Sequence, residues 1–391
     1  MQLDVDRARR ETPGCVSTLH FNNAGAALPP ACVTDSVIRH LRREAEIGGY
    51  EAEAEAEEAL ANTYLGAARL LGCDRDEIAL MESATRGWDM GFYSLPMGSG
   101  DRILASMAEY SSNYIALLQR ASHTGAVIEV IPSDESGALS VPMMEQMLDE
   151  RVKLIAITHV GTNGGLVNPA EKVGRAANAA GIPYLLDATQ SMGQMEINVK
   201  KIGCDMLCAT GRKYLRGPRG TGLLYVRRAL AESLEPPFLD NYAAEWESRD
   251  RFAINPGARR FETWESSVAN RIGLGVAIEY ALDWGLGAIR VRVVSLAEIL
   301  RSRLDLIPGI TVRDLGTVRC GIVTFTVEGK SGWDVRTALH ARSINVWVSP
   351  MASTRLDMEA RGLKDLVRAS VHYYNTEEEI DAFCVALESL T

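Results

Sequence analysis

A single lysine follows a short apolar segment in CDMLCATGRKYLRGPRGTG, residues 204–222, and its position suits covalent chemistry. The apolar run 206–209 leads into Thr210-Gly211-Arg212-Lys213, and residues rich in Gly, Pro and Arg follow at once. A second apolar segment, IPYLLDA at 182–188, contains Asp187 near its end. A carboxylate is costly to bury unless it meets a positive partner. An aspartate and a lysine at the ends of successive strands therefore predict one shared cleft.

The sequence ESATRG at 82–87 adds a predicted anion site to that cleft. We expect Thr85 to be the N-cap of a helix whose free backbone N–H groups can bind an anion. Arg212 has two uses, because it can pair with a phosphate and can lower the pKa of the neighbouring Lys213. A nucleotide-binding GxxxxGK[ST] loop is excluded, because the lysine precedes the glycines and a tyrosine follows it.

Together these residue types are the protein parts that hold pyridoxal phosphate. A lysine forms the covalent bond to the aldehyde of this cofactor, and an aspartate pairs with its ring nitrogen. A helix N-terminus holds its phosphate. The pattern therefore predicts a pyridoxal-phosphate site built around Lys213 and Asp187.

The order of elements predicts a fold that can position these groups. Short apolar strands alternate with helices from 78 to 226, which indicates an α/β fold with a mainly parallel sheet flanked by helices. Ligands bind such sheets beyond the carboxyl ends of the strands. From about 290, antiparallel strands and helices predict a smaller α+β domain. We expect an N-terminal segment (1–40) that contributes to a substrate loop and the small domain, a large cofactor domain (41–285) and a small C-terminal domain (286–391).

Composition limits the classes of function. The net charge of −10 and the pI near 5.3 argue against nucleic-acid or anionic-membrane binding. The seven cysteines show no metal-ligand spacing, so no metal site is expected. No apolar segment reaches the roughly 18 residues of a membrane span, and the N-terminus lacks a secretion signal. We therefore expect a reduced, cytoplasmic protein.

Seven motifs in order resemble the class V, fold type I pyridoxal-phosphate enzymes, and the resemblance covers nearly the whole chain. This group holds cysteine desulfurases, isopenicillin N epimerase-like proteins and cysteine-conjugate C–S lyases. The motifs are FNNAGAALPP (21–30), ESATRGWDM (82–90), HVGTNGGLVNP (159–169), DATQSMGQ (187–194), ATGRKYLRGPRGTGLLYV (209–226), RFETWESS (260–267) and VRASVHYYNTEEEID (367–381).

The resemblance implies roles for cofactor-binding residues. Lys213 forms the covalent bond, Asp187 holds the ring nitrogen, and Gln190 reaches the ring hydroxyl. Tyr110 stacks on the ring and is the third catalytic candidate. The implied phosphate contacts are Ala84, Thr85, Arg86, Thr210, Arg212 and, from the partner subunit of a homodimer, the residue at position 266, a serine here.

The resemblance also implies a substrate site. Arg368 is expected to grip the substrate carboxylate, a task suited to a guanidinium. The implied helpers are Asn23, Gly25, Thr162 and Asn163. The candidates for contact with the sulfur-linked part are Trp88, Trp264, Trp347 and Arg355.

Three departures from the desulfurase pattern set the expected reaction. Tyr110 and Arg212 stand where desulfurases have histidines, and the segment INVWVSPMASTRLD (344–357) has no sulfur-accepting cysteine. We therefore expect a β-eliminating C–S lyase that acts on a cysteine S-conjugate or sulfoxide and yields a thiol or sulfenate, pyruvate and ammonia. An epimerase, a decarboxylating deaminase or an aminotransferase is the alternative, and a non-catalytic binding module on the same fold is a further one.

Overall fold

The computed structural model describes residues 3–391, and its largest element is a seven-stranded sheet. The strand order is β2-β8-β7-β6-β5-β3-β4. Strand β8 pairs antiparallel with both neighbours, and the pairs from β7 to β4 are parallel, which confirms the mainly parallel α/β sheet. The strands are β2 Ile78–Met81, β3 Arg102–Ala105, β4 Val127–Val130, β5 Val152–Thr158, β6 Tyr184–Asp187, β7 Met206–Thr210 and β8 Gly222–Val226.

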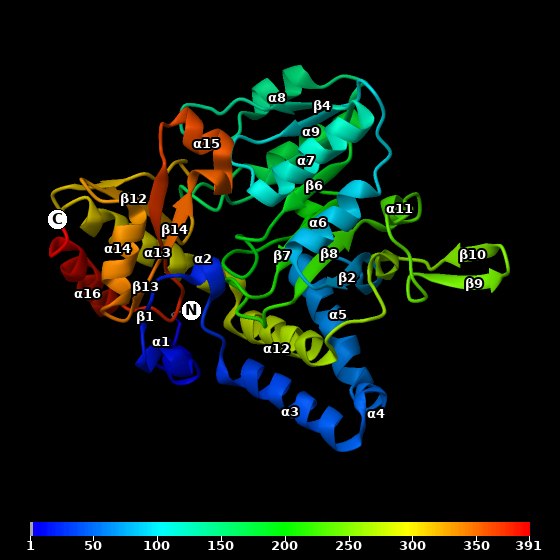
Figure 1. Cartoon of the computed structure of the whole chain (residues 1–391), viewed down its shortest axis with the longest axis horizontal. Coiled ribbons are helices and arrows are strands. Elements are labelled where there is room, and N and C mark those ends of the chain that lie inside the picture. The colour runs from blue at the N-terminus through cyan, green and yellow to red at the C-terminus, as the bar shows by residue number, and fades with distance from the viewer. Residues whose placement is uncertain (1–2) are drawn as a thin grey trace.

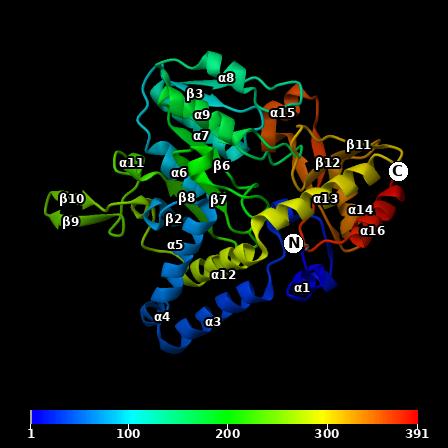
Figure 2. The same cartoon turned by 180° about the vertical axis from the view of Figure 1, so that it is seen from behind.

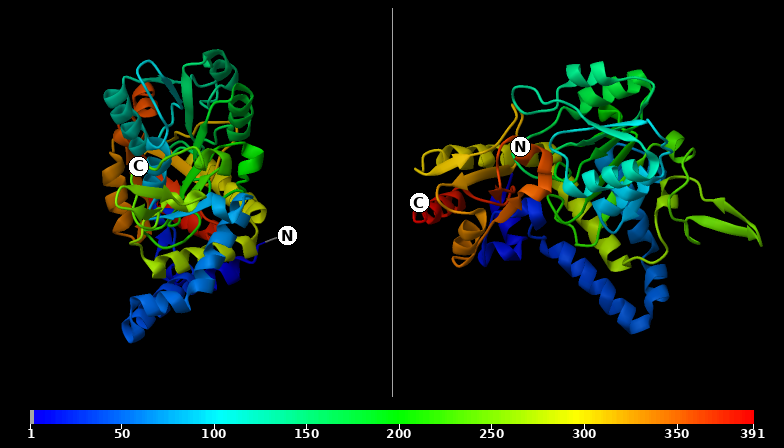
Figure 3. Two further views of the ribbon diagram at one scale, coloured as in Figure 1. Left: turned by 90° about the vertical axis from the view of Figure 1, so that its right-hand side faces the viewer. Right: turned by 45° about the horizontal axis from the view of Figure 1, so that its top comes forward.

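Alternation along the buried strands divides the core between the two faces of this sheet. Leu185 and Met206 pack with the helices α6 (Ala84–Tyr93) and α7 (Ser111–Thr124), whereas Leu186 packs on the opposite side with α9 (Ala170–Ala180). Successive side chains of a strand point to opposite faces. Helices cover both faces, as the turned views show (Figure 3). Asp187 therefore points to the α6–α7 face.

Helices before and after the large sheet form a third group. Residues 49–71 form two helices, α4 Gly49–Glu55 and α5 Glu57–Leu71, with a break at Ala56. The acidic side chains of 51–58 are exposed. The other helices of the group are α3 Ala31–Ile47 and α12 Val268–Trp284, and α12 packs against both α5 and α3.

A second, antiparallel sheet of four strands lies in the C-terminal part, with order β11-β12-β15-β14. The short strand β1 (Leu19–His20) pairs in parallel with β13 (Ile344–Asn345), so the N-terminal segment lies against this part (Figure 2). The domain boundaries at 40 and 285 stay a prediction. The elements are β11 Ile310–Val312, β12 Ile322–Val327, β14 Trp347–Pro350, β15 Asp365–Ser370, α13 Leu286–Leu304, α14 Gly332–His340, α15 Arg355–Ala360 and α16 Glu377–Glu388.

A hairpin of β9 (Ala244–Ser248) and β10 (Arg251–Ile254) projects from the body of the molecule, at the right of Figure 1. The sequence reading missed this hairpin. Within residues 3–391 the longest apolar helices fall short of a membrane span individually, and only α12 and α13 taken together meet the length and composition criteria, with a 79° bend between them.

Candidate active site

A cavity of about 230 Å³ opens where β5, β6 and β7 end, at the edge of the sheet where the sequence places its chemistry. Residues predicted at separate points of the chain line it together. They are Ala84, Thr85, Tyr110, Thr162, Asp187, Gln190, Thr210, Arg212 and Lys213. The structure thus assembles most of the predicted cofactor site.

Lys213 is buried in this cavity, with 9% of its surface exposed. Its Nζ has no hydrogen-bond or ion-pair partner among residues 3–391 and lies 6.0 Å from the centre of the Tyr110 ring. The pKa of Lys213 is lowered to about 7, mainly by burial and also by the charges of Arg212 and Arg368, against the raising effect of Asp187. The amine is therefore available as a nucleophile and base near neutral pH.

The lowered pKa of Lys213 predicts a pH-dependent stability of the protein without cofactor. An unfolded lysine titrates near pH 10.4, so between about pH 7 and pH 10.4 the unfolded state binds more protons and the free energy of unfolding rises with pH. The variant Lys213→Met lacks this penalty. We expect its gain over wild type in urea unfolding to be largest at pH 7 or below and to shrink towards about pH 10.

The control for this measurement is Lys201→Met, because Lys201 is an exposed lysine at the end of α10 (Val199–Ile202). Its substitution should leave the pH profile of unfolding unchanged. An equal gain from Lys213→Met at every pH would contradict the assignment of a depressed pKa to this buried amine.

Asp187 is 5% exposed and is held by neutral donors. Its Oδ2 accepts from Asn113 Nδ2 at 2.8 Å, and its Oδ1 accepts from the Thr189 N–H at 2.8 Å. No ion pair to Asp187 occurs within residues 3–391, so the positive partner that a buried carboxylate requires has to come from a ligand. Sequence reasoning missed Asn113, whose only signal was its place one helical turn beyond Tyr110 in AEYSSNY.

Tyr110 stands directly before α7, at the cavity wall. Its predecessor Glu109 is 3% exposed and accepts hydrogen bonds from the Thr158 N–H at 2.8 Å and from the hydroxyls of Thr158 and Ser106. Burial raises the pKa of Glu109 to about 7. This carboxyl anchors the start of α7 to the end of β5 and so fixes the Tyr110 ring over the cavity.

The start of α6 forms the predicted anion cradle, with one correction. Ser83, not Thr85, is the N-cap, and its Oγ accepts from the Arg86 N–H at 3.0 Å. The N–H groups of Ala84 and Thr85 have no partner among the described residues and face the cavity. Thr85 is thereby free to contact an anion rather than to cap the helix.

Two cations line the cavity near this cradle. Arg212 donates to the carbonyl of Gly25, and burial lowers its pKa, with a further contribution from the charge of Arg219. Arg219 also lines the cavity, and sequence reasoning gave it no role although it lies within the motif 209–226. The Thr210 hydroxyl donates to the Thr221 carbonyl at 3.1 Å, so in this arrangement its proton is not available for a hydrogen bond to a phosphate.

Two predicted phosphate contacts lie outside the cavity. The Arg86 guanidinium lies over the Phe238 ring, 5.1 Å from its centre, and Arg86 is not among the residues that line the cavity, so its phosphate contact stays a prediction. Ser266 does not line the cavity of its own subunit either, and Ser267, not Ser266, caps α12. The contact of Ser266 with a partner subunit's phosphate stays a prediction.

Arg368 is buried, with 5% of its surface exposed, and adjoins the cavity through Thr162, which lines it. Its Nη1 donates to the hydroxyl and the carbonyl of Thr162, at 2.6 and 3.2 Å. Its Nε is buried without a partner, and burial lowers its pKa to about 10. A buried guanidinium with an unused donor and no carboxylate nearby is arranged to receive an anion.

Further unpaired oxygens surround Thr162. Gln190 Nε2 donates to the Ala24 carbonyl at 3.1 Å and its Oε1 is free. Asn163 Nδ2 donates to the Thr354 hydroxyl at 2.7 Å and its Oδ1 is free. The Asn22 Oδ1 is buried and unpaired as well, and sequence reasoning missed it. Of these three residues Gln190 lines the cavity, so its free Oε1 is an acceptor that can orient a ligand there.

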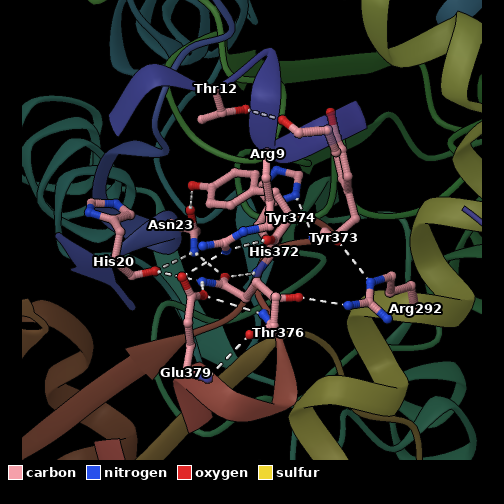
Figure 4. Close-up of polar contacts among 12 residues, drawn as sticks. Arg9, Thr12, His20, Asn23, Arg292, His372, Tyr373, Tyr374, Thr376 and Glu379 are labelled. Carbon is pink, nitrogen blue, oxygen red and sulfur yellow. Dashed lines mark hydrogen bonds and ion pairs between the residues drawn. The ribbon is translucent and has the colours of Figure 1, made fainter. Parts of the chain in front are cut away.

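Asn23 is held in a network of hydrogen bonds. Its Nδ2 donates to the Ser370 carbonyl at 2.7 Å, and its Oδ1 accepts from the Tyr374 hydroxyl. Figure 4 shows Asn23 within this network, between His20 and the aromatic residues of the C-terminal segment. Asn23 therefore fixes the N-terminal loop, and Gly25 accepts a hydrogen bond from Arg212 through its carbonyl. The contacts of both residues with a substrate stay a prediction.

The four candidates for contact with the sulfur-linked part lie away from this cavity, and their contact with a substrate stays a prediction. Trp88 is 0% exposed in the core between α6 and the sheet. Trp264 packs beside Tyr242, and Trp347 packs beside Trp333 on the surface of the C-terminal part. Arg355 is paired with Glu359 on one exposed helix face. None of these residues lines the cavity.

The cavity fits pyridoxal phosphate by the chemistry of its donors. An unpartnered lysine amine and a carboxylate held only by neutral donors face one another across it, and a helix N-terminus with free N–H groups closes one end. The unpaired Oε1 of Gln190 supplies an acceptor for a ring hydroxyl. A Schiff base, a pyridinium and a phosphate are the complements of these groups. Pyridoxal phosphate is the cofactor of this site.

Comparison with known proteins agrees with this arrangement. Residues 19–383 match the family model described as "Aminotransferase class-V". A probable cysteine desulfurase of Xylella fastidiosa is 32% identical over 376 residues, which cover 94% of this chain and 90% of that protein. A probable cysteine desulfurase of Halalkalibacterium halodurans is 33% identical over 300 residues, covering 75% and 71%.

Solved structures share the fold along the whole chain. The apo structure of a cysteine desulfurase from Thermococcus onnurineus NA1 has a TM-score of 0.93 and 27% identity, covering 100% of this chain and 98% of that one. The cystine C–S lyase C-DES, in complex with its reaction product cysteine persulfide, has a TM-score of 0.87 and 20% identity, covering 96% and 99%. The second likeness concerns the fold alone.

Proposed function

The chain belongs to the class-V aminotransferase family, and from that membership we propose that it is a pyridoxal-phosphate-dependent carbon–sulfur lyase that eliminates the sulfur substituent of a cysteine S-conjugate or sulfoxide. The products are pyruvate, ammonia and the released thiol or sulfenate. The geometry of the cavity supports a pyridoxal-phosphate enzyme. The lack of a cysteine thiol in the cavity lining supports elimination as its reaction.

The absence of a thiol at the substrate end of the cavity carries the proposal. None of the seven cysteines of the chain, all of them in the described part, lines the cavity. Cys208 is nearest in the fold, opposite Asp187 on β7, and burial raises the pKa of its thiol well above the ordinary value. A reaction that ends with sulfur on a protein cysteine lacks its acceptor here, whereas elimination needs none.

The chain's own residues account for binding and proton transfer in the proposed reaction. Arg368 holds the substrate carboxylate through its free Nε and so presents the Cα–H bond to Lys213. The neutral Nζ of Lys213 takes that proton. The bound cofactor supplies the electron sink that makes the Cα–H bond acidic.

Loss of the β-substituent follows from the acidity of thiols. The Cβ–S bond breaks with both electrons going to sulfur, and a thiol pKa near about 8.5 makes the thiolate a good leaving group. The Lys213 ammonium lies in the same cavity and can return its proton to the departing sulfur. Water then converts the enamine product to pyruvate and ammonia, so the sum is conjugate plus water to thiol, pyruvate and ammonium.

A cysteine desulfurase is the second candidate, and the names of the relatives favour it. In that reaction a substrate cysteine yields alanine while its sulfur passes to a thiol. Within this chain such a thiol would have to reach the cavity from elsewhere, or a free thiol would have to serve. An epimerase, a decarboxylating deaminase and an aminotransferase use the same Lys213, Asp187 and Arg368, and a non-catalytic module would leave these groups without a reaction.

Product analysis separates the candidates. Purified enzyme with cofactor is offered cysteine, cystine and a panel of cysteine S-conjugates and sulfoxides, with Lys213→Ala as control. Pyruvate and free thiol in equal amounts, absent with the variant, are the expected result. Alanine with enzyme-bound or thiol-bound persulfide identifies a desulfurase, and a D-amino acid, an aldehyde or a keto acid without thiol release identifies one of the other reactions. If no substrate gives a product, the non-catalytic binding module is the remaining candidate.

The quaternary state and location remain proposals that rest on other residues. We propose a homodimer, because the resemblance gives position 266, Ser266 here, a role towards the partner subunit's phosphate and the residue lies away from its own cavity. We also propose the cytoplasm as its location, since all seven cysteines are unpaired, as is usual in a reducing compartment. The proposed partner is a small amino-acid substrate.

A further inference from the structure

The turn that carries Lys213 ends at an arginine with an unusual backbone conformation. Arg216 has φ of +63°, the left-handed region that favours glycine. Its N–H donates to the Lys213 carbonyl at 2.9 Å, which closes the turn 213–216. Non-glycine residues held in this region point to a local constraint worth explaining. The side chain of Arg216 supplies that explanation.

The Arg216 side chain is 2% exposed and joins three segments of the chain. Its Nε donates to the Leu28 carbonyl at 2.8 Å, and its Nη2 donates to the Thr12 hydroxyl. Its Nη1 donates to the Tyr373 hydroxyl at 2.6 Å. Each segment is distant in sequence from the lysine turn, so this guanidinium fixes where the turn lies relative to the N-terminal loop and the C-terminal segment.

A cage of aromatic rings replaces a carboxylate as the partner of this buried charge. The guanidinium carbon lies 4.6, 5.3 and 5.6 Å from the ring centres of Tyr374, Tyr373 and Tyr280. Arg216 forms no ion pair with any residue in 3–391. Cation–π attraction over several ring faces holds a guanidinium in a defined place without bringing a negative charge near Lys213.

The same C-terminal segment also holds Tyr214, the neighbour of Lys213. His372 Nδ1 accepts from the Tyr373 N–H at 2.9 Å, so its Nε2 carries the proton and donates to the Tyr214 carbonyl at 3.0 Å. Figure 4 shows His372, Tyr373 and Tyr374 grouped beside Asn23, with Thr12 above them. This segment continues β15, which carries Arg368.

The N-terminal loop is bound to the lysine turn at several points. The Ala27 N–H donates to the Arg212 carbonyl at 3.0 Å, and Arg212 donates to the Gly25 carbonyl. The bond from Arg216 to Leu28 completes this contact. The proton-carrying amine and the carboxylate-binding guanidinium are thus joined through one buried network, in which the Arg216 side chain bonds to both flanking segments.

We propose that Arg216 is a positioning residue for Lys213: its caged guanidinium locks the lysine turn to the segment that carries Arg368, so that the amine and the substrate carboxylate site keep a fixed separation. The inference rests on the proposed function only in that Lys213 moves the proton at the substrate Cα. Loss of this lock leaves both groups present but lets the turn move and admits water to the amine.

The test compares Arg216→Met and Arg216→Lys with Arg292→Met. Arg292 is the matched control, because it binds the same C-terminal segment, donating to the carbonyls of Tyr373 at 2.8 Å and Asn375 at 2.7 Å, but does not contact the lysine turn. Each variant is checked for fold by circular dichroism and thermal unfolding. Tyr373→Phe, which removes one acceptor and keeps the ring, is the milder variant.

The first readout needs no substrate. Pyridoxal phosphate is added to the protein without cofactor at a series of pH values, borohydride fixes what has bound, and peptide mapping measures attachment at position 213. We expect the midpoint of attachment for Arg216→Met to move to higher pH than wild type, because a wetter amine titrates closer to an ordinary lysine. Arg292→Met should keep the wild-type midpoint.

The second readout is steady-state kinetics with a cleaved S-conjugate. For Arg216→Met we expect kcat to fall roughly 10- to 100-fold with KM changed less than about threefold, as for a misplaced catalytic group, with Arg216→Lys between this variant and wild type. A wild-type midpoint and kcat in folded Arg216→Met, or an equal loss in Arg292→Met, would overturn the proposal. If Arg216→Met does not fold, wild-type behaviour of both Arg216→Lys and Tyr373→Phe would overturn the proposal instead. A wild type that cleaves no conjugate refutes the proposed function alone, because the attachment profile still tests Arg216.

Discussion

Lys213→Ala is expected to abolish turnover, with kcat reduced by at least about 10³-fold, because the variant loses the group that carries the Cα proton. The amine is also the only unpartnered, buried lysine amine lining the cavity within residues 3–391, so no neighbour replaces it. The measurement is pyruvate release under saturating substrate and cofactor, together with borohydride fixation of the cofactor. The variant should bind cofactor without forming a bond that borohydride can fix.

A control separates loss of chemistry from loss of fold in this experiment. Lys201→Ala removes an exposed lysine of α10 and should behave as wild type in both measurements. Added primary amines of small size should restore part of the activity of Lys213→Ala, since they can enter the vacated space and take the proton. A variant that keeps the wild-type rate would end the assignment of Lys213 as the proton carrier and, with it, the reaction proposed above.

Asp187→Asn is expected to lower kcat by about 10²- to 10³-fold, the loss that follows removal of one fixed electrostatic group from an active site. An amide keeps the shape of the side chain. Its one oxygen can accept from the Thr189 N–H, and its NH2 can donate to Asn113 once that side-chain amide turns over, so the fold should be retained. The charge that faces a protonated ring nitrogen is lost. Kinetics at saturating cofactor measure this effect apart from any weaker cofactor binding.

Asn113→Ala is the matched variant for Asp187, because it removes one neutral donor to the carboxylate and leaves the charge. We expect a smaller loss of kcat, of about tenfold or less, equivalent to one displaced hydrogen bond. Equal losses in the two variants would mean that orientation rather than charge decides the contribution of Asp187. Wild-type kinetics in Asp187→Asn would contradict the placement of a cofactor ring nitrogen beside this carboxylate.

Near the expected substrate site, the chain departs from the desulfurase pattern but keeps the groups that a pyridoxal-phosphate enzyme requires. Arg368 keeps a free Nε donor, and Thr162 orients the guanidinium through two hydrogen bonds. The segment 344–357, where the resemblance places the desulfurase cysteine, contains Thr354, whose hydroxyl accepts from Asn163. A hydrogen bond to the wall of the site thus stands in the region where a mobile sulfur acceptor would be expected.

Local pattern was enough to predict the sheet and the two central groups. Apolar strands of four to seven residues alternate with helices, and Asp187 and Lys213 follow strands that pair side by side as β6 and β7. Strand ends are defined by the chain itself, and the carboxyl ends of parallel strands must meet at one edge. The positions of these two residues could therefore be predicted from the sequence, and the order of the motifs indicated the family.

Tertiary packing decided which of the other candidates reach the cavity. Trp88 and Asn23 belong to motifs of the right kind, yet the first fills the core and the second holds the N-terminal loop against Ser370. Asn113 belongs to none of the seven motifs and Arg216 had no role assigned within its motif, yet one holds the catalytic carboxylate and the other is enclosed by tyrosines from elsewhere in the chain. A side chain's partners depend on segments that lie hundreds of residues away, and only the folded chain brings those segments within hydrogen-bond distance.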